Sequence, residues 1–205
     1  YDLAESGNEL DRSILATTVT TLPCKVALLS RPETIEQHEA ITPEVIHRVI
    51  ELMALVYENV VIDVPGRFDI QTIAAMGQAD LILIVCQLQV PSLRNAKRFF
   101  ETLTRMGVPE ERIEVVINRS DGKSGRLTER DVEETLKKPV FAIIPNDYQF
   151  VARSIDFGRP IAALDRNSPV RAAIRKMARK IVVEPAHKTP KKEERKGLFS
   201  RLLSK

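Results

Sequence analysis

The stretch Asn59-Val-Val-Ile-Asp-Val-Pro-Gly66 decides the fold class, because an apolar run here ends in a carboxylate, a proline and a glycine. The three residues before Asp63 are consecutive and β-branched, which predicts a strand buried on both faces, as in a parallel sheet. In open α/β sheets, ligands bind beyond the carboxyl ends of the strands. Asp63 therefore either meets a ligand at the end of this strand or begins a turn with the proline and glycine that follow it.

Predicted strands and helices alternate along the rest of the chain. Short apolar runs predict further strands at residues 25–30, 80–86, 114–119 and 139–145. Helical spacing of apolar residues and capping signals predict helices at residues 8–19, 42–57, 70–76, 91–105, 128–137, 147–156 and 168–182. This alternation predicts right-handed crossovers, and hence an α/β fold with a mostly parallel sheet flanked by helices on both faces.

Capping residues mark several of the predicted helix ends. Asn8 and Thr42 are candidate N-caps, and Thr42 is followed by a proline at the first helical position. Thr128 with Asp131 three residues later predicts a capping box. Gly107 is a typical C-terminal signal. These signals fix where helices begin and end more firmly than apolar spacing alone.

Composition is that of an ordinary globular protein. The chain has 205 residues, of which 43% are apolar and 29% charged, enough for one domain with a large core. No window of the sequence approaches eighteen consecutive apolar residues, so no transmembrane helix is predicted. The net charge of +3 is uneven, because residues 184–205 contain seven basic and three acidic side chains. The basic character therefore belongs to the C-terminal segment.

The two cysteines, Cys24 and Cys86, lie in apolar stretches without metal-ligand or CxxC spacing. We interpret them as two buried, reduced thiols, which fits a cytosolic location. The three histidines are scattered in the sequence, and no Ser-His-Asp arrangement is recognisable.

Polar residues follow three of the predicted strands. Asp63 ends the first, Asn118 and Arg119 end another, and Pro145-Asn-Asp147 follows a third. The carboxyl ends of parallel strands meet at one edge of a sheet, so these groups are predicted to converge on one ligand. Each also has a structural interpretation: an Asx turn, a solvated strand end or a helix N-cap.

These same segments resemble a known family. The stretch at 60–66 is similar to the switch II segment of MinD/ParA-type P-loop ATPases, and Asn118-Arg119 and Ile144-Pro-Asn-Asp147 resemble their adenine-side loops. A closer resemblance is to the CpaE/TadZ branch, the ATPases of Flp or Tad pilus assembly. The segments that support this are Ile41-Thr-Pro-Glu44, Pro91-Ser-Leu-Arg-Asn-Ala96, Pro139 to Asp147, Gly158-Arg-Pro160 and Ser168-Pro-Val-Arg171.

The resemblance implies ATP and Mg²⁺ as cofactors. Asp63 would hold the Mg²⁺ shell as the metal residue, and Gly66 would offer a backbone N–H near the γ-phosphate, which makes these two the predicted catalytic residues. Asn118, Arg119, Pro145 and Asp147 would flank the adenine. The full set of predicted nucleotide-binding residues is Asp63, Pro65, Gly66, Asn118, Arg119, Pro145, Asn146 and Asp147. Where the family has a second small or proline residue after Asp-x-Pro, this chain has Gly66-Arg67.

The sequence departs from the family in one large respect. Neither a G-x-x-x-x-G-K-[ST] nor a K-G-G-x-x-K-[ST] segment occurs between Tyr1 and Lys205, although the chemistry needs such a loop to hold the phosphates. Gly122-Lys-Ser124 is interpreted as an ordinary loop. Either the chain is N-terminally incomplete and begins after the phosphate loop, or the protein is a degenerate ATPase kept as a scaffold.

The C-terminal segment has its own organisation. We predict a partial ATPase domain at 1–183, a flexible basic linker at 184–196 and a short amphipathic helix at 197–205. Leu198, Phe199, Leu202 and Leu203 fall on one stripe of that helix, beside basic residues. Such a helix can lie in a membrane interface, and it is similar to the C-terminal membrane helix of MinD. Docking to the domain or to a partner, and binding to nucleic acid, are the alternatives.

The predicted function is therefore an ATP-binding and ATP-hydrolysing localisation and assembly factor of a Flp/Tad-type pilus. It would be cytoplasmic, peripherally associated with the inner membrane through the C-terminal helix, and an ATP-linked homodimer whose partners are pilus or secretion proteins. The alternatives are a non-catalytic scaffold and a ParA-like partitioning ATPase that binds DNA, nucleic acid being the less favoured partner. Arg94, Lys97 and Arg98 form a basic helix face, which is either a solvated surface or, as the resemblance allows, a contact for a partner or DNA.

Overall fold

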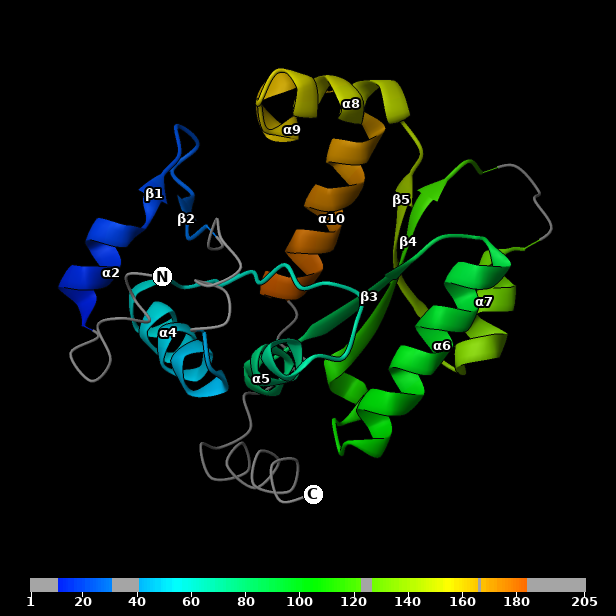
Figure 1. Ribbon diagram of the computed structural model, residues 1–205. Coiled ribbons are helices and arrows are strands. Elements are labelled where there is room, and N and C mark those ends of the chain that lie inside the picture. Colours follow the sequence, from blue (N-terminus) through cyan, green and yellow to red (C-terminus); the bar gives the residue numbers. More distant parts are fainter. Residues whose placement is uncertain (1–10, 31–40, 123–126, 166, 184–205) are drawn as a thin grey trace. The chain divides into compact units, whose positions relative to one another are not determined.

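The computed structural model describes residues 11–30, 41–122, 127–165 and 167–183 (Figure 1). Internal contacts divide the described chain into a first unit, up to Ala79, and a second unit, from Asp80 onward. None of the helices among the described residues is both long and apolar enough to cross a membrane.

The second unit is built on a parallel sheet of three strands. They are β3 (Ile82–Cys86), β4 (Ile113–Ser120) and β5 (Val140–Pro145), in the order β3-β4-β5. β3 pairs with β4 in regular register, with Ile84 opposite Val115. Parallel neighbours require crossover connections, and here α6 (Val90–Arg105) joins β3 to β4 while α7 (Glu129–Leu136) joins β4 to β5. The predicted mostly parallel sheet is confirmed.

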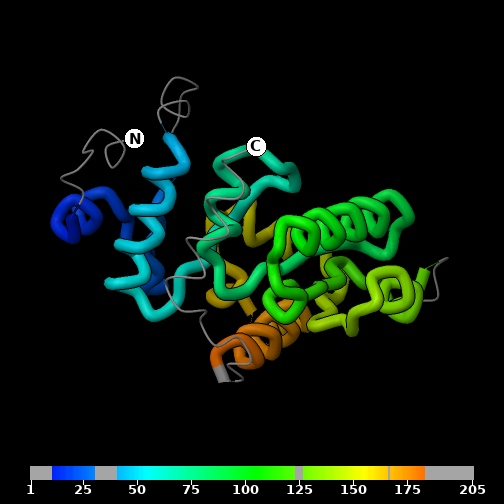
Figure 2. The backbone as a smooth tube through the Cα atoms, turned by 90° about the horizontal axis from the view of Figure 1, so that it is seen from below, coloured from blue at the N-terminus to red at the C-terminus, as the bar shows by residue number. Residues whose placement is uncertain are grey.

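Helices cover both faces of this sheet, as the sequence predicts. α6 and α7 lie on one side and α10 (Pro169–Val183) lies on the other, in both views (Figures 1 and 2). The other described elements of the unit are the 3₁₀ turn η2 (Glu110–Arg112), α8 (Tyr148–Asp156) and α9 (Ile161–Leu164).

β4 is the central strand, and its middle residues are buried on both faces. Ile113, Val115 and Ile117 are each 0% exposed on one face of the strand. On the other face, buried Val116 clusters with Ile144 of β5 and Val170 of α10. A strand buried on both faces is what an uninterrupted apolar run predicts.

The described residues of the first unit form three helices and a small antiparallel strand pair. The helices are α2 (Arg12–Thr18), α4 (Pro43–Val56) and α5 (Ile70–Gln78), and the strands are β1 (Thr20–Thr21) and β2 (Ala27–Leu28). Leu15 of α2 and Leu52 of α4 form the centre of its apolar cluster.

Two strand predictions in this unit are wrong. Residues 59–63 form no strand, and Val61 is 94% exposed, because no described segment supplies backbone hydrogen bonds on either side of them. Residues 25–30 give only the two-residue β2, which pairs antiparallel with β1 and is not buried. Cys24 is correspondingly exposed rather than buried, whereas Cys86 is buried as predicted.

The capping predictions hold well. Thr42 caps α4, and Thr128 with Asp131 forms the complete capping box of α7. Gly107 adopts a left-handed φ of 86° just after α6. The N-cap of α2 is Asp11, which accepts hydrogen bonds from two backbone N–H groups, and Asn8 lies outside the described residues.

Asp69 is the N-cap of α5 and provides a testable pH effect. Its carboxylate accepts a hydrogen bond of 2.7 Å from Thr72 N and one of 2.6 Å from Arg67 Nε. These contacts, the Thr72 hydrogen bond first, lower the pKa of Asp69 from 3.8 to about 2. Because the folded state lowers this pKa, the carboxylate stabilises the fold above its ordinary pKa and stops doing so as the pH falls toward 2.

We therefore expect Asp69→Ala to lower the free energy of unfolding by about 1 kcal/mol at neutral pH, a modest value because the carboxylate is partly exposed. Urea unfolding of both proteins from about pH 6 down to about pH 2.5 should show this difference shrinking as the pH falls. A difference that stays constant over this range would contradict the assigned role.

Candidate functional site

The carboxyl ends of β4 and β5 come together at one edge of the second unit. Ser120 lies opposite Pro145 in the ladder, and the backbone N–H of Asn146 donates to Ser120 O at 2.9 Å. The side chain of Asn146 adds a second link, since its Nδ2 donates to Asp121 Oδ1 at 2.7 Å. The two segments that the sequence assigns to the adenine side are thus joined by backbone and side-chain hydrogen bonds.

A β-bulge shapes the β4 side of this edge. The register between β4 and β5 shifts between Ile117 and Ser120, and Arg119 adopts a left-handed φ of 55°. The Asn118 side chain supports this conformation, because its Oδ1 accepts a hydrogen bond of 2.9 Å from Arg119 N. Asn118 is half-buried, whereas Arg119 is exposed. Bulges of this kind often redirect side chains beside functional sites, and here the bulge presents Arg119 to solvent.

On the β5 side, Asp147 begins a helix. Its Oδ1 accepts a hydrogen bond of 3.2 Å from Phe150 N, and it is the N-cap of α8. Pro145 ends β5, and Gly158, with φ of 57°, follows the end of α8. The structural interpretation of Asp147 as a helix cap is therefore correct, and any contact with a nucleotide would be an additional role.

The remaining predicted site residues lie in the first unit. Asp63, Pro65 and Gly66 belong to an exposed segment outside any helix or strand, which bends at Gly66, where the N–H of Arg67 donates to Pro65 O at 2.8 Å. A Cβ added at Gly66 would meet nothing within 4 Å, so packing within the described residues gives no reason for a glycine there. The convergence of Asp63 with the β4–β5 edge stays a prediction.

The donor set fits Mg²⁺ in one specific way. Among the described residues, no group of three or more His, Cys, Asp or Glu side chains could hold a metal ion by itself. Mg²⁺, however, is commonly bound through one or two carboxylates together with substrate phosphates and water. Asp63 is an exposed carboxylate, and among the described residues no hydrogen bond or ion pair engages it. It suits such a site when phosphate groups supply further oxygens.

Sequence reasoning missed one participant, Asp121, which holds Asn146 at the site edge. The signal that could have found it is its position directly after β4 and before Gly122, which itself has a left-handed φ of 62°. The predicted membrane residues, Leu198, Phe199, Leu202 and Leu203, lie outside the described residues, as do the predicted linker and terminal helix.

Comparison with family models finds no match. Curated relatives are nevertheless similar in sequence. An uncharacterized ATP-binding protein of Methanocaldococcus jannaschii is 25% identical over 186 residues, covering 87% of this chain and 69% of its own length. The septum site-determining protein MinD of Thermotoga maritima is 26% identical over 147 residues, covering 70% of this chain and 54% of its own length.

Solved structures show the fold. A ParA family ATPase from Chlorobium tepidum superposes with a TM-score of 0.80 at 24% identity, covering 89% of this chain and 74% of that one. MinD from Pyrococcus horikoshii, solved as a complex with Mg-ADP, gives a TM-score of 0.73 at 19% identity, covering 89% of this chain and 73% of that one. The chain therefore has the α/β fold of ParA/MinD-type P-loop ATPases, and it spans only part of the length of these proteins.

Proposed function

We propose that this chain is part of an ATP-binding and ATP-hydrolysing protein of the ParA/MinD type. The observation that supports this most directly is the hydrogen-bonded edge where β4 meets β5. There the backbone of Asn146 is tied to Ser120, so the two segments that resemble adenine-side loops form a single structure. ATP-binding relatives and a fold shared with a Mg-ADP complex agree with this proposal.

In this proposal, different residues of the chain bind the base, the metal ion and the phosphates. Asn118 and the backbone around the bulge bind the base, with Arg119, Pro145 and Asp147 beside it. Asp63 holds the metal, with Pro65 and Gly66 close to the phosphates. When bound, Mg²⁺ would neutralise negative charge on the phosphates. The catalytic contribution of this chain is thus positioning and electrostatic stabilisation.

The proposal also requires a phosphate-binding loop from residues outside the sequence. Two features of the structure support it. Val61 and Ile62 are apolar yet exposed, and residues 59–63 form no strand among the described residues. β3 pairs only with β4 in the described chain, so one of its edges is open. Each could accept one further parallel strand. The encoded sequence before Tyr1 tests this: a glycine-rich loop with its lysine supports the ATPase, and its absence favours the non-catalytic scaffold.

At a finer level we propose a localisation and assembly factor of a Flp/Tad-type pilus, similar to CpaE/TadZ, that dimerises with ATP and associates with the inner membrane through residues 197–205. The segments 91–96 and 158–160 support this reading beyond the general fold. A ParA-like partitioning ATPase would instead bind duplex DNA with strong salt dependence. Pilus assembly in a strain lacking the protein distinguishes these two roles.

The nucleotide site is tested by Asn118→Ala in the intact protein. Removing a half-buried amide that supports the bulge should weaken Mg-ATP binding about 10-fold, the cost of about one hydrogen bond. Asn95→Ala, on the exposed side of α6, is the matched control and should leave the affinity unchanged. Fluorescent-nucleotide titration measures both. If Asn118→Ala binds Mg-ATP as tightly as Asn95→Ala, the β4–β5 edge is not part of the nucleotide site.

A further inference from the structure

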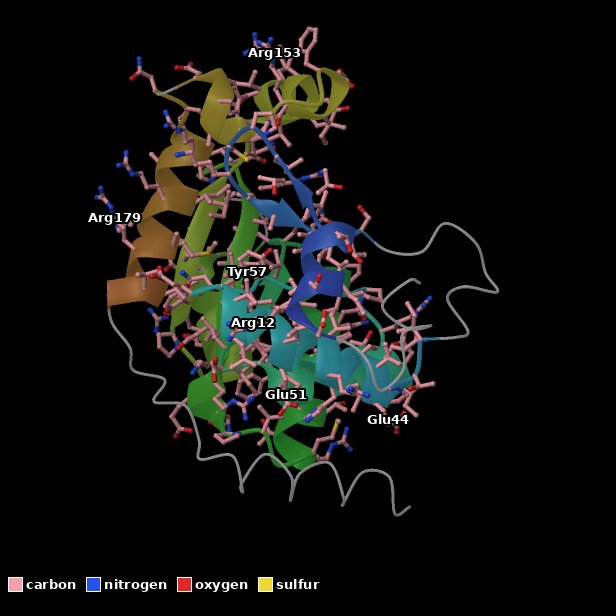
Figure 3. The ribbon with its side chains drawn as sticks, turned by 90° about the vertical axis from the view of Figure 1, so that its left-hand side faces the viewer. Arg12, Glu44, Glu51, Tyr57, Arg153 and Arg179 are labelled. Carbon is pink, nitrogen blue, oxygen red and sulfur yellow. The ribbon has the colours of Figure 1, made fainter. Side chains whose placement is uncertain are left out.

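The outward side of α10 is exposed, and all of its charged side chains are positive. Arg175, Lys176 and Arg179 are exposed on this helix, and no Asp or Glu occurs between Pro169 and Val183. Figure 3 shows the labelled Arg179 extending from α10 away from the rest of the ribbon. We call Arg175, Lys176 and Arg179 the basic face of α10.

The inner side of α10 fixes which residues face outward. Val170, Ala173 and Met177 pack against the sheet cluster. Lys180 Nζ donates to Phe141 O at 2.9 Å and lies 5.1 Å from the centre of the Phe141 ring. α10 is thus anchored to β5 along its length, and at 3.6 residues per turn the basic face must lie on the opposite side.

The basic face lacks the charge compensation found on other helices. Each of two other helices places a carboxylate beside a cation four residues away, at distances of 3.9 Å in α6 and 2.7 Å in α7. Within the described residues, no ion pair involves Arg175, Lys176 or Arg179. Like charges at this spacing repel each other, so this arrangement does not serve the stability of the helix.

An apolar residue accompanies the cations. Val182 is 62% exposed, and its position three residues after Arg179 places it on the same side of the helix. The chain then continues into residues 184–205, whose seven basic and three acidic side chains extend the same charge. Cations beside exposed apolar groups are typical of surfaces that lie in a membrane interface, whereas nucleic-acid contacts need only the cations.

We propose that the basic face of α10 binds the headgroups of an anionic bilayer and thereby sets the orientation of the second unit on the membrane. This inference rests on the membrane association in the proposed function, and it assigns to the folded domain a contact that the sequence assigned only to the terminal segment.

The test compares two double variants of the intact protein. Arg175→Ala/Arg179→Ala removes two cations from the basic face of α10. Arg94→Ala/Arg98→Ala is the matched control: both arginines are exposed, they have the same spacing, and α6 lies on the other side of the sheet (Figure 1). Both variants change the net charge equally.

Binding is measured by sedimentation with vesicles of equal parts phosphatidylglycerol and phosphatidylcholine. Since one basic residue near an anionic surface strengthens binding about 5-fold, the α10 variant should bind about 25-fold more weakly. The α6 variant should change less than about 3-fold, because its cations lie away from the contact. Circular dichroism of both variants establishes that they are folded.

The other results overturn the proposal. Equal weakening of both variants would mean that only net charge matters, and unchanged binding of the α10 variant would exclude this face. Loss of duplex DNA binding without loss of vesicle binding would assign the face to nucleic acid. Mg-ATP binding, measured on the intact protein, fails or succeeds independently of all these outcomes, so the inference and the proposed function can be rejected separately.

Discussion

Asp63→Asn should slow ATP hydrolysis by the intact protein about 100-fold, the usual cost of removing one group that stabilises charge in a transition state. The substitution keeps the size of the side chain and removes the charge that would hold the metal in the proposed function. Asp63 is exposed and makes no hydrogen bond among the described residues, so the thermal stability of the fold should not change. Phosphate release under saturating Mg-ATP measures the rate.

Asp156→Asn is the control for this experiment. Asp156 is also an exposed aspartate, located in the last turn of α8, and its loss should leave the rate unchanged. If Asp63→Asn hydrolyses ATP as fast as the wild type, the assignment of the metal residue is wrong. If both variants lose activity equally, the effect is one of charge in general.

Ile117→Ala should destabilise the protein by about 3 kcal/mol, as expected when a fully buried aliphatic side chain is truncated in a packed core. Ile117 is 0% exposed and lies in the middle of β4, opposite Cys86 of β3 and Ile143 of β5. The cavity would open in the strand that both neighbours pair with. Chemical unfolding followed by far-ultraviolet circular dichroism measures the loss.

Ile155→Ala makes the same chemical change at a site that is 74% exposed. It should alter the unfolding free energy by less than about 0.5 kcal/mol, as is usual for surface positions. Comparable losses at the two positions would mean that Ile155 is covered in solution, or that β4 is not the centre of the core.

The second unit could be predicted from sequence because its signals are local and consistent. The apolar runs that become β3, β4 and β5 are bounded by caps such as Thr128 and by glycines such as Gly107. Strand neighbours that follow each other in sequence also pair in space, so their order needs no distant information.

The predicted strand at residues 59–63 shows where this reasoning fails. A β-branched run indicates a preference for extended backbone, but a strand exists only where another chain segment completes its hydrogen bonds. The described residues supply none, and Val61 is exposed. Cys24 fails for a related reason, since the neighbouring apolar run gives only the exposed pair β1–β2.

The sequence predicted which residues belong to the candidate site, but not how their backbones and side chains are arranged. Polar residues after strands located both loops, yet periodicity contains nothing about the bulge at Asn118 or the hydrogen bond from Asn146 to Asp121. Both depend on how two strands end relative to each other. Such long-range detail becomes visible only once the sheet is assembled.

The left-handed backbone at Arg119 has a consequence for protein engineering. An L-residue held in that conformation costs about 1 kcal/mol, which glycine would avoid. A laboratory selection for heat resistance alone would therefore drift toward glycine at this position. In the proposed function Arg119 lies beside the base, and selection for nucleotide binding would then retain its guanidinium, so the two selections would favour different residues at position 119.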